Sequence, residues 1–163
     1  MTLIFWKRKK ENAPSVKAPA TVSEASGRWG EGVAGRYLEQ RGWRILERNV
    51  RPCCTDRRCE IDLIAFAPYE QKVVFVEVKT HRRHSAFARR LWAVDRSKKR
   101  NVLRACASWV MRRKWHGNFR FDVIEVYGIE GGGSPEIDHI ENIHLFPPHW
   151  RSEEHTSELQ SRI

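Results

Sequence analysis

Apolar residues at helical spacing predict two helices in this chain. The first is expected to begin near Ser26 and to stop at Gly42, and its apolar positions are Val33, Ala34, Tyr37 and Leu38. A longer helix is expected from Asp95, a favourable N-cap residue, to about Trp115. Its apolar positions are Val102, Cys106, Trp109 and Val110, whereas Arg96, Arg100 and Arg104 fall on the opposite face. Both helices are therefore expected to pack one face against the rest of the protein.

Apolar runs of strand length predict a sheet. Strands are expected at 43–50, 60–66, 73–79 and 119–126, with an edge strand within 137–146. Pro68 marks a turn between the second and third of these strands. Strands adjacent in sequence can form hairpins, and the long helix allows a crossover to a parallel neighbour. We therefore predict an α/β fold with a mixed central sheet of four to five strands flanked by helices.

The two central strands carry charged residues that are unusual in a core strand. Because side chains alternate between the faces of a strand, Glu60 and Asp62 share one face of the first. Glu77 and Lys79 likewise share one face of the second. A hairpin that closes around residues 69 and 70 pairs residues whose numbers sum to 139. Asp62 is then expected opposite Glu77, and Glu60 opposite Lys79, close enough for their side chains to interact.

Carboxylates packed this closely predict a metal site. They repel one another and raise one another's pKa unless a cation lies between them. Mg²⁺ or Mn²⁺ is the expected cation, because hard divalent ions prefer oxygen ligands, and Asp62 and Glu77 are the candidate ligands. Lys79 would place a positive charge beside an attacking water and a scissile phosphate. The alternative is a structural salt bridge between Lys79 and either Glu60 or Glu77, which a short Glu-x-Lys triplet alone does not exclude.

Glu31, in the first predicted helix, has two interpretations. In the first turn of a helix, a carboxylate is favoured by the helix dipole. Glu31 also borders the apolar stripe, three residues before Ala34 and seven before Leu38, which would let it face the sheet and join the other carboxylates. The spacing leaves both interpretations open.

The chain is strongly basic. It has 30 Lys and Arg against 20 Asp and Glu, a net charge of +10. Between Lys79 and Lys114, 13 basic residues accompany a single acidic one, Asp95. This favours a polyanionic partner such as nucleic acid, the alternative being a solvated basic face. The candidates for nucleic-acid contact are Arg82, Arg83, Arg96, Lys98, Lys99, Arg100 and Arg104.

The two ends of the chain are expected to lie outside a single domain at residues 26–148. Residues 1–25 combine a basic run, Lys7–Lys10, with Pro, Ala and Ser, which predicts a disordered basic arm. Residues 149–163 look non-native, because the sequence from about Arg151 resembles the translation of a common sequencing adapter. The four cysteines lack disulfide or zinc spacing, and no apolar stretch is long enough for a membrane span, so we expect a cytoplasmic protein.

Short motifs spread over residues 27–146 together resemble one known family. They are Gly27-x-x-Gly-Glu31, Tyr37-Leu, Gly42-Trp-x-Ile-Leu46, Asn49-x-Arg51, Glu60-Ile-Asp-Leu-Ile64, Phe75-Val-Glu-Val-Lys-Thr80, Val94-Asp, Lys98 and Arg120-Phe-Asp-Val-Ile124. This set resembles the YraN-like family, a widespread bacterial family predicted to be endonucleases. Its order of helical Glu, strand Asp and Glu-x-Lys is similar to that of the PD-(D/E)xK nuclease superfamily, and the family is related in pattern to archaeal Holliday-junction resolvases.

The resemblance implies a restriction-endonuclease-like fold and a metal-dependent endonuclease that hydrolyses DNA phosphodiester bonds. DNA is favoured over RNA, and branched or structured DNA is suggested by the resolvase analogy. The resemblance makes Asp62 and Glu77 metal ligands, Lys79 the catalytic lysine, and Glu31 a supporting acid that contacts the metal through water. Glu60 matches the motif, but its role as a ligand stays open. Because resolvases work as dimers, a homodimer is expected by analogy.

Two positions depart from the family pattern. Cys59 stands where the family has Gly before Glu-Ile-Asp, and His81 stands where it has Arg after Val-Lys-Thr. The alternative function is a non-catalytic nucleic-acid-binding protein that retains the fold. The intact set of Asp62, Glu77 and Lys79 argues against it, because a retired site has no reason to keep buried charges.

Overall fold

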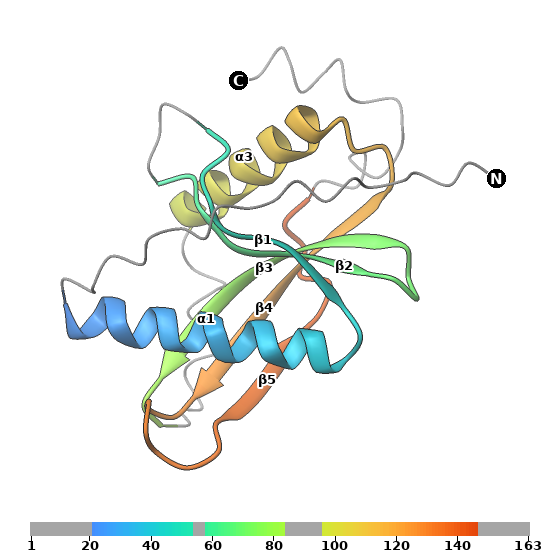
Figure 1. Cartoon of the computed structure of the whole chain (residues 1–163). Helices are drawn as coiled ribbons and strands as arrows, with labels where there is room; N and C mark the ends of the chain where they lie inside the picture. The colour runs from blue at the N-terminus through green and yellow to red at the C-terminus, as the bar shows by residue number, and fades with distance from the viewer. Residues whose placement is uncertain (1–20, 54–57, 84–95, 147–163) are drawn as a thin grey trace, which may run out of the picture.

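The computed structural model describes residues 21–53, 58–83 and 96–146, apart from the side chains of Val22 and Arg96 (Figure 1). Its elements are α1 (Val22–Gln40), β1 (Arg44–Val50), β2 (Ile61–Ala67), β3 (Lys72–His81), α3 (Arg96–Arg113), β4 (Asn118–Tyr127) and β5 (Glu136–Ile140). They confirm the predicted order of helix, strands, helix and strands. The predicted arm as far as residue 20, the Asp95 N-cap and the tail at 149–163 lie outside the described residues.

Within the described residues, the strands form one five-stranded sheet in the order β1-β2-β3-β4-β5. β3 and β4 run parallel, and the other neighbours run antiparallel. α3 lies between the two parallel strands in the chain, as a parallel pair requires a crossover. The predicted α/β fold with a mixed sheet is confirmed, and the architecture is consistent with a restriction-endonuclease-like fold. None of the described helices is long and apolar enough to cross a membrane.

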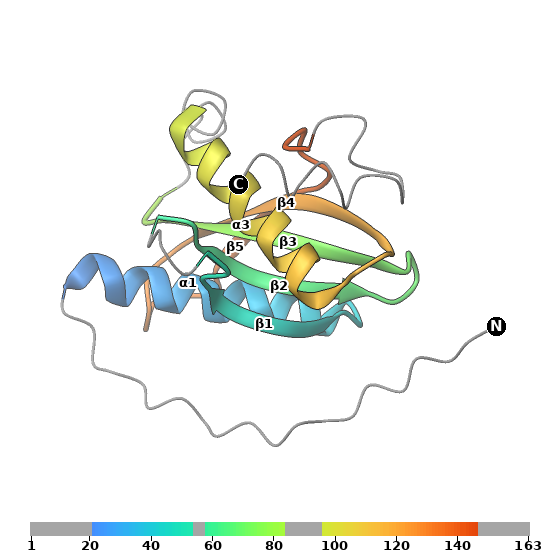
Figure 2. The ribbon, with the colours of Figure 1, turned by 90° about the horizontal axis from the view of Figure 1, so that it is seen from above.

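The two helices cover opposite faces of the sheet (Figure 2). Val74 and Val76 of β3 pack with Leu38 of α1. Phe75 of the same strand packs with Trp109 of α3, and the two ring centroids are 5.5 Å apart. Because both faces are buried, the central strands are apolar at successive positions instead of alternating with polar residues.

The β2–β3 hairpin has the predicted register, but its pairing ends before the charged residues. The paired residues are Leu63–Val76, Ile64–Phe75, Ala65–Val74, Phe66–Val73 and Ala67–Lys72, and each pair sums to 139. β3 continues as far as His81, and over its whole length it pairs with β4. The two hairpin strands therefore separate just before Asp62 and Glu77, which leaves the edge of β3 that faces β2 open beyond this point.

α1 begins earlier than predicted, at Val22. Thr21 caps the helix, since its side-chain oxygen accepts a hydrogen bond from the backbone N–H of Glu24 at 3.2 Å. At the other end, Gly42 has a φ of +79°, the left-handed conformation that glycine favours after a helix, in agreement with the predicted stop. Residues 22–25 therefore belong to the helix and not to the predicted arm.

A buried polar network ties β4 to β5 and to the start of β1. Asp122 is fully buried and accepts hydrogen bonds from Nε of Arg120 at 3.1 Å and from the backbone N–H of Asn142 at 2.8 Å. Nε2 of His139 lies 2.9 Å from its other oxygen. The Arg120 guanidinium lies over the ring of Trp43, 5.3 Å from its centroid. The Arg-x-Asp motif of β4 therefore has a structural role in this part of the sheet.

Candidate active site

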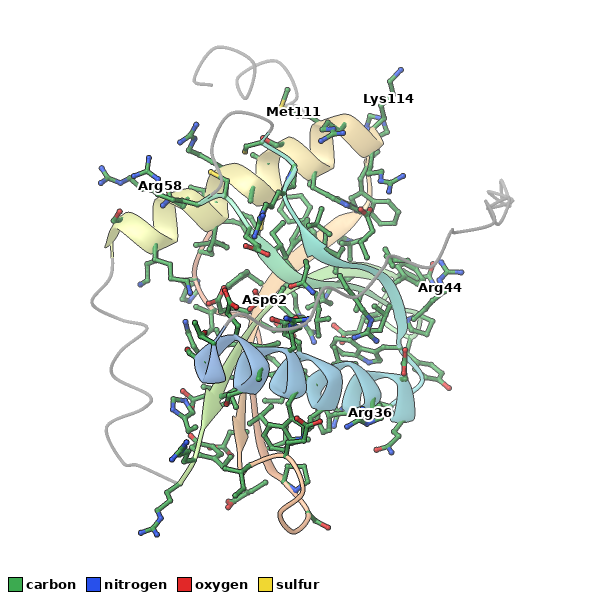
Figure 3. The ribbon with its side chains drawn as sticks, turned by 60° about the vertical axis from the view of Figure 1, so that its left-hand side comes forward. Arg36, Arg44, Arg58, Asp62, Met111 and Lys114 are labelled. Atoms are coloured by element: carbon green, nitrogen blue, oxygen red, sulfur yellow. The ribbon has the colours of Figure 1, made fainter. Side chains whose placement is uncertain are left out.

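A cleft of about 520 Å³ opens where β2 and β3 separate, between α1 and the start of α3. Its lining residues are Ser23, Ser26, Gly27 and Glu31 of α1, Asp62 of β2, Glu77, Val78, Lys79 and Thr80 of β3, Arg82 just after β3, and Lys98 of α3. Figure 3 shows Asp62 in the space between the two helices. The four residues predicted to act together, Glu31, Asp62, Glu77 and Lys79, thus line one cleft.

The carboxylate of Asp62 binds the open edge of β3. Its Oδ2 accepts a hydrogen bond from the backbone N–H of Val78 at 2.7 Å, so a side chain satisfies a donor that the strand pairing leaves available. Burial of the carboxyl group and the nearby charge of Glu77 raise the pKa of Asp62 to about 7, although the bond from Val78 acts to lower it. A cation placed near Asp62 would therefore stabilise the ionised form of its carboxyl group.

Glu77 is buried, with 4% of its surface exposed, and its Oε1 accepts hydrogen bonds from two ammonium groups. Nζ of Lys79 lies 2.8 Å away, and Nζ of Lys98 contacts the same oxygen. Burial alone would lower the pKa of Lys98, but the charge of Glu77 and its hydrogen bond outweigh burial, so the pKa is raised. The salt bridge weighed as an alternative is therefore present between Lys79 and Glu77, inside a cleft that other carboxylates share.

Glu31 faces the cleft from the middle of α1, since the helix begins nine residues earlier at Val22. The first-turn interpretation of Glu31 was therefore wrong. A close contact brings α1 to the sheet here, because a Cβ on Gly30 would lie only 2.0 Å from Oγ1 of Thr80. Burial raises the pKa of Glu31, partly offset by a side-chain hydrogen bond with Asn49.

Glu60 lies outside the cleft. The β2–β3 pairing stops before it, so it is not opposite Lys79 as the extended register would require. Its Oε2 instead accepts hydrogen bonds from Nε and Nη2 of Arg51 at 3.1 and 2.8 Å. Glu60 is not among the residues that line the cleft, although its charge contributes to the raised pKa of Glu31. The structure thus separates Glu60 from the other carboxylates.

Sequence reasoning missed several cleft residues and contacts. The contact between Lys98 and Glu77 was not anticipated, and the expected nucleic-acid contact of Lys98 stays a prediction. Ser23 and Gly27 were not anticipated as cleft residues. Their spacing held a signal, because Ser23, Gly27 and Glu31 follow one another at four-residue intervals and so lie on one helix face.

The donor set of the cleft fits a magnesium-like ion. Within the part of the chain that the structure describes, no three His, Cys, Asp or Glu side chains converge on one metal position. Mg²⁺ does not need such a cage, because it keeps several waters and is usually held by one or two carboxylates together with substrate phosphates. Asp62 and Glu77 could supply those carboxylates, and Glu31 lines the same cleft.

The basic candidates divide between the cleft and the surface around it. Arg82 and Lys98 line the cleft, whereas Arg83, Arg100 and Arg104 are exposed and Lys99 is partly exposed. Arg96 is the first residue of α3, but its side chain lies outside the described residues. Basic residues therefore flank the acidic cleft on the loop after β3 and on α3.

Comparison with known proteins places the chain in a family. Residues 30–126 match the profile of "Uncharacterised protein family UPF0102". A UPF0102 protein of Pelobacter propionicus is 43% identical over 134 residues, which cover 82% of this chain and 91% of the relative. One of Trichlorobacter lovleyi is 37% identical over 121 residues, or 74% and 90% of the two chains. A third, of Bifidobacterium longum, is 35% identical over 120 residues, or 71% and 90%. The YraN-like assignment is thereby confirmed, and the chain belongs to the UPF0102 family.

Proposed function

We propose that the protein is a metal-dependent endonuclease that hydrolyses DNA phosphodiester bonds, with Mg²⁺ or Mn²⁺ as cofactor. The observation that carries the proposal is the cleft itself. It gathers Glu31, Asp62, Glu77 and Lys79 from a helix and two strands beside Arg82 and Lys98. One buried and two partly buried carboxylates next to cations in an open cleft suit phosphoryl chemistry.

In this proposal Asp62 and Glu77 would hold the divalent ion, and Glu31 would support it through a water. A bound ion of this kind lowers the pKa of its water and stabilises charge on a phosphate oxygen. The raised pKa of Asp62 supports its own assignment, because a carboxylate short of positive charge gains from a cation more than one already neutralised.

Lys79 and Lys98 have a double role in the proposed mechanism. In the structure both ammonium groups neutralise Oε1 of Glu77. When another cation balances Glu77, the same groups are within the cleft to contact an anionic substrate. Lys79 is assigned to orient the attacking water and to offset charge that develops on the phosphate, because a preorganised cation is most effective where charge forms in the transition state.

The basic surface around the cleft supports a nucleic-acid substrate. Arg82 at the cleft, with Arg100 and Arg104 on α3, would bind phosphates along the strand. Such binding releases counterions and therefore weakens steeply with salt. DNA is favoured over RNA and branched DNA over linear duplex only through the family resemblance. A homodimer stays a prediction, which light scattering would test.

The decisive experiment is a cleavage assay on four-way junction, single-stranded and duplex DNA and on RNA, with Mg²⁺, Mn²⁺ or EDTA. Wild type is expected to cleave at least one substrate when metal is present. Asp62→Ala and Lys79→Ala are expected to lower the rate by at least about a hundredfold. Glu60→Gln is the matched control, because it removes a nearby carboxylate that lies outside the cleft, and its rate is expected to stay within about threefold of wild type.

The alternative is a nucleic-acid-binding protein without catalytic activity. It requires the basic surface but not the carboxylates. Binding without cleavage of any substrate under all metal conditions would overturn the proposed enzyme and leave this alternative. Cleavage of RNA alone would keep the enzyme and change its substrate.

A further inference from the structure

α1 contains glycine at positions 27, 30, 32 and 35, and at two of the four the protein's own side chains lie close to where a Cβ would be. Glycine destabilises a helix interior relative to alanine, because it loses more backbone freedom on folding. A Cβ on Gly30 would lie 2.0 Å from Oγ1 of Thr80, and one on Gly35 would lie 2.4 Å from Nη1 of Arg48. At these two positions the protein's own side chains occupy the space that a larger residue would need.

Gly27 and Gly32 have no such explanation. No described atom lies within 4 Å of a Cβ built on Gly27, and a Cβ on Gly32 would meet Nη1 of Arg36 at an ordinary 3.6 Å. Neither residue has the left-handed backbone conformation that would require glycine. The two differ in one respect, which is that Gly27 lines the cleft and Gly32 does not.

We infer that Gly27 keeps room for the sugar–phosphate backbone of a nucleic-acid strand, which lies against α1 beside the carboxylates. This inference rests on the proposed function and names where the substrate strand is seated. Gly27 is one helical turn before Glu31 and faces the same cleft. A glycine at this place lets a ligand backbone approach the helix more closely than any side chain would allow.

The surroundings of Gly27 fit the backbone of a strand better than its bases. Ser23 and Ser26 line the same cleft as Gly27, and Arg82 and Lys98 add cations to it. Hydroxyls and cations are the usual contacts to phosphate and sugar oxygens. Among the described lining residues Val78 is the one apolar side chain and none is aromatic, so the cleft offers no ring on which a base could stack.

The test compares Gly27→Ala and Gly27→Leu with Gly32→Ala and Gly32→Leu in the full chain. Alanine at either position is expected to raise the unfolding midpoint by about 3 °C, because it favours the helix. The value of kcat/KM for the cleaved substrate is expected to fall about tenfold for Gly27→Ala and about a hundredfold for Gly27→Leu, because the strand is displaced from the carboxylates. Both Gly32 variants are expected to stay within about twofold of wild type.

Two further measurements distinguish a loss of substrate binding at Gly27 from a general loss of stability. The Gly27 variants should raise KM, and in EDTA they should weaken binding of the same labelled substrate by a similar factor, while remaining at least as stable as wild type. A Gly27→Leu protein that is stable and fully active would overturn the inference and leave the proposed function intact. A Gly27→Ala protein less stable than wild type would also overturn it, because the space would then not be open. A wild type that cleaves nothing overturns the proposed function and this inference together.

Discussion

Replacing Asp62 by Asn is expected to stabilise the metal-free protein above neutral pH. Asp62 is partly buried, accepts a hydrogen bond from the N–H of Val78 and lies near the charge of Glu77. Its pKa rises from 3.8 to about 7 on folding. Roughly three pKa units at about 1.4 kcal/mol each correspond to about 4 kcal/mol of lost stability when the group is ionised.

The direction of the pH dependence follows from which state of the protein, folded or unfolded, holds the Asp62 proton. Between the ordinary pKa of 3.8 and about 7, the folded protein keeps the Asp62 proton while the unfolded chain has released it. The free energy of unfolding therefore falls as pH rises through this window. Asparagine has no proton to release, and its side-chain oxygen can still accept the hydrogen bond from Val78. The variant should match wild type near about pH 4 and exceed it by up to about 4 kcal/mol near about pH 8.

Urea denaturation in EDTA, followed by tryptophan fluorescence, measures this difference at both pH values. Glu60→Gln is the control, because Glu60 is paired with Arg51 outside the cleft and its replacement should bring no gain at high pH. Adding Mg²⁺ should reduce the difference in free energy of unfolding between the variant and wild type, since the ion stabilises the wild-type carboxylate and not the amide. An Asp62→Asn protein that is less stable near about pH 8, or that differs from wild type equally at both pH values, would refute the reasoning.

Two more predictions concern the helices that border the cleft. Gly30→Ala would place a Cβ 2.0 Å from Oγ1 of Thr80, so α1 must shift and carry Glu31 with it. We expect the free energy of unfolding, measured by urea denaturation, to fall by about 1–3 kcal/mol, and cleavage to become slower. A stable, fully active variant would contradict this. Replacing both Arg100 and Arg104 by Gln should reduce the slope of log affinity against log salt by about two, measured by fluorescence anisotropy with labelled DNA. An unchanged slope would remove this face of α3 from the DNA contact.

The sequence determined the elements and the register because both depend on local spacing. The periodicity of apolar residues identified α3 and the strands, and the turn after Pro68 fixed which residues of β2 and β3 are opposite each other. The pairing of Leu63 with Val76 followed from that turn. The short motifs also identified the candidate residues Asp62 and Glu77, since the type and spacing of charged residues in a strand are visible without a structure.

Only the tertiary structure decided which of these charges share a site. The apolar spacing does not record where the hairpin strands separate. In the structure the pairing ends at Leu63 and Val76, and Glu60 binds Arg51 instead of lying opposite Lys79. Lys98 reaches Glu77 from 21 residues away in the sequence. Such contacts form between segments whose approach is set by the packing of the whole core. The sequence therefore determined which chemistry was available, and the packing of the helices on the sheet determined where it comes together.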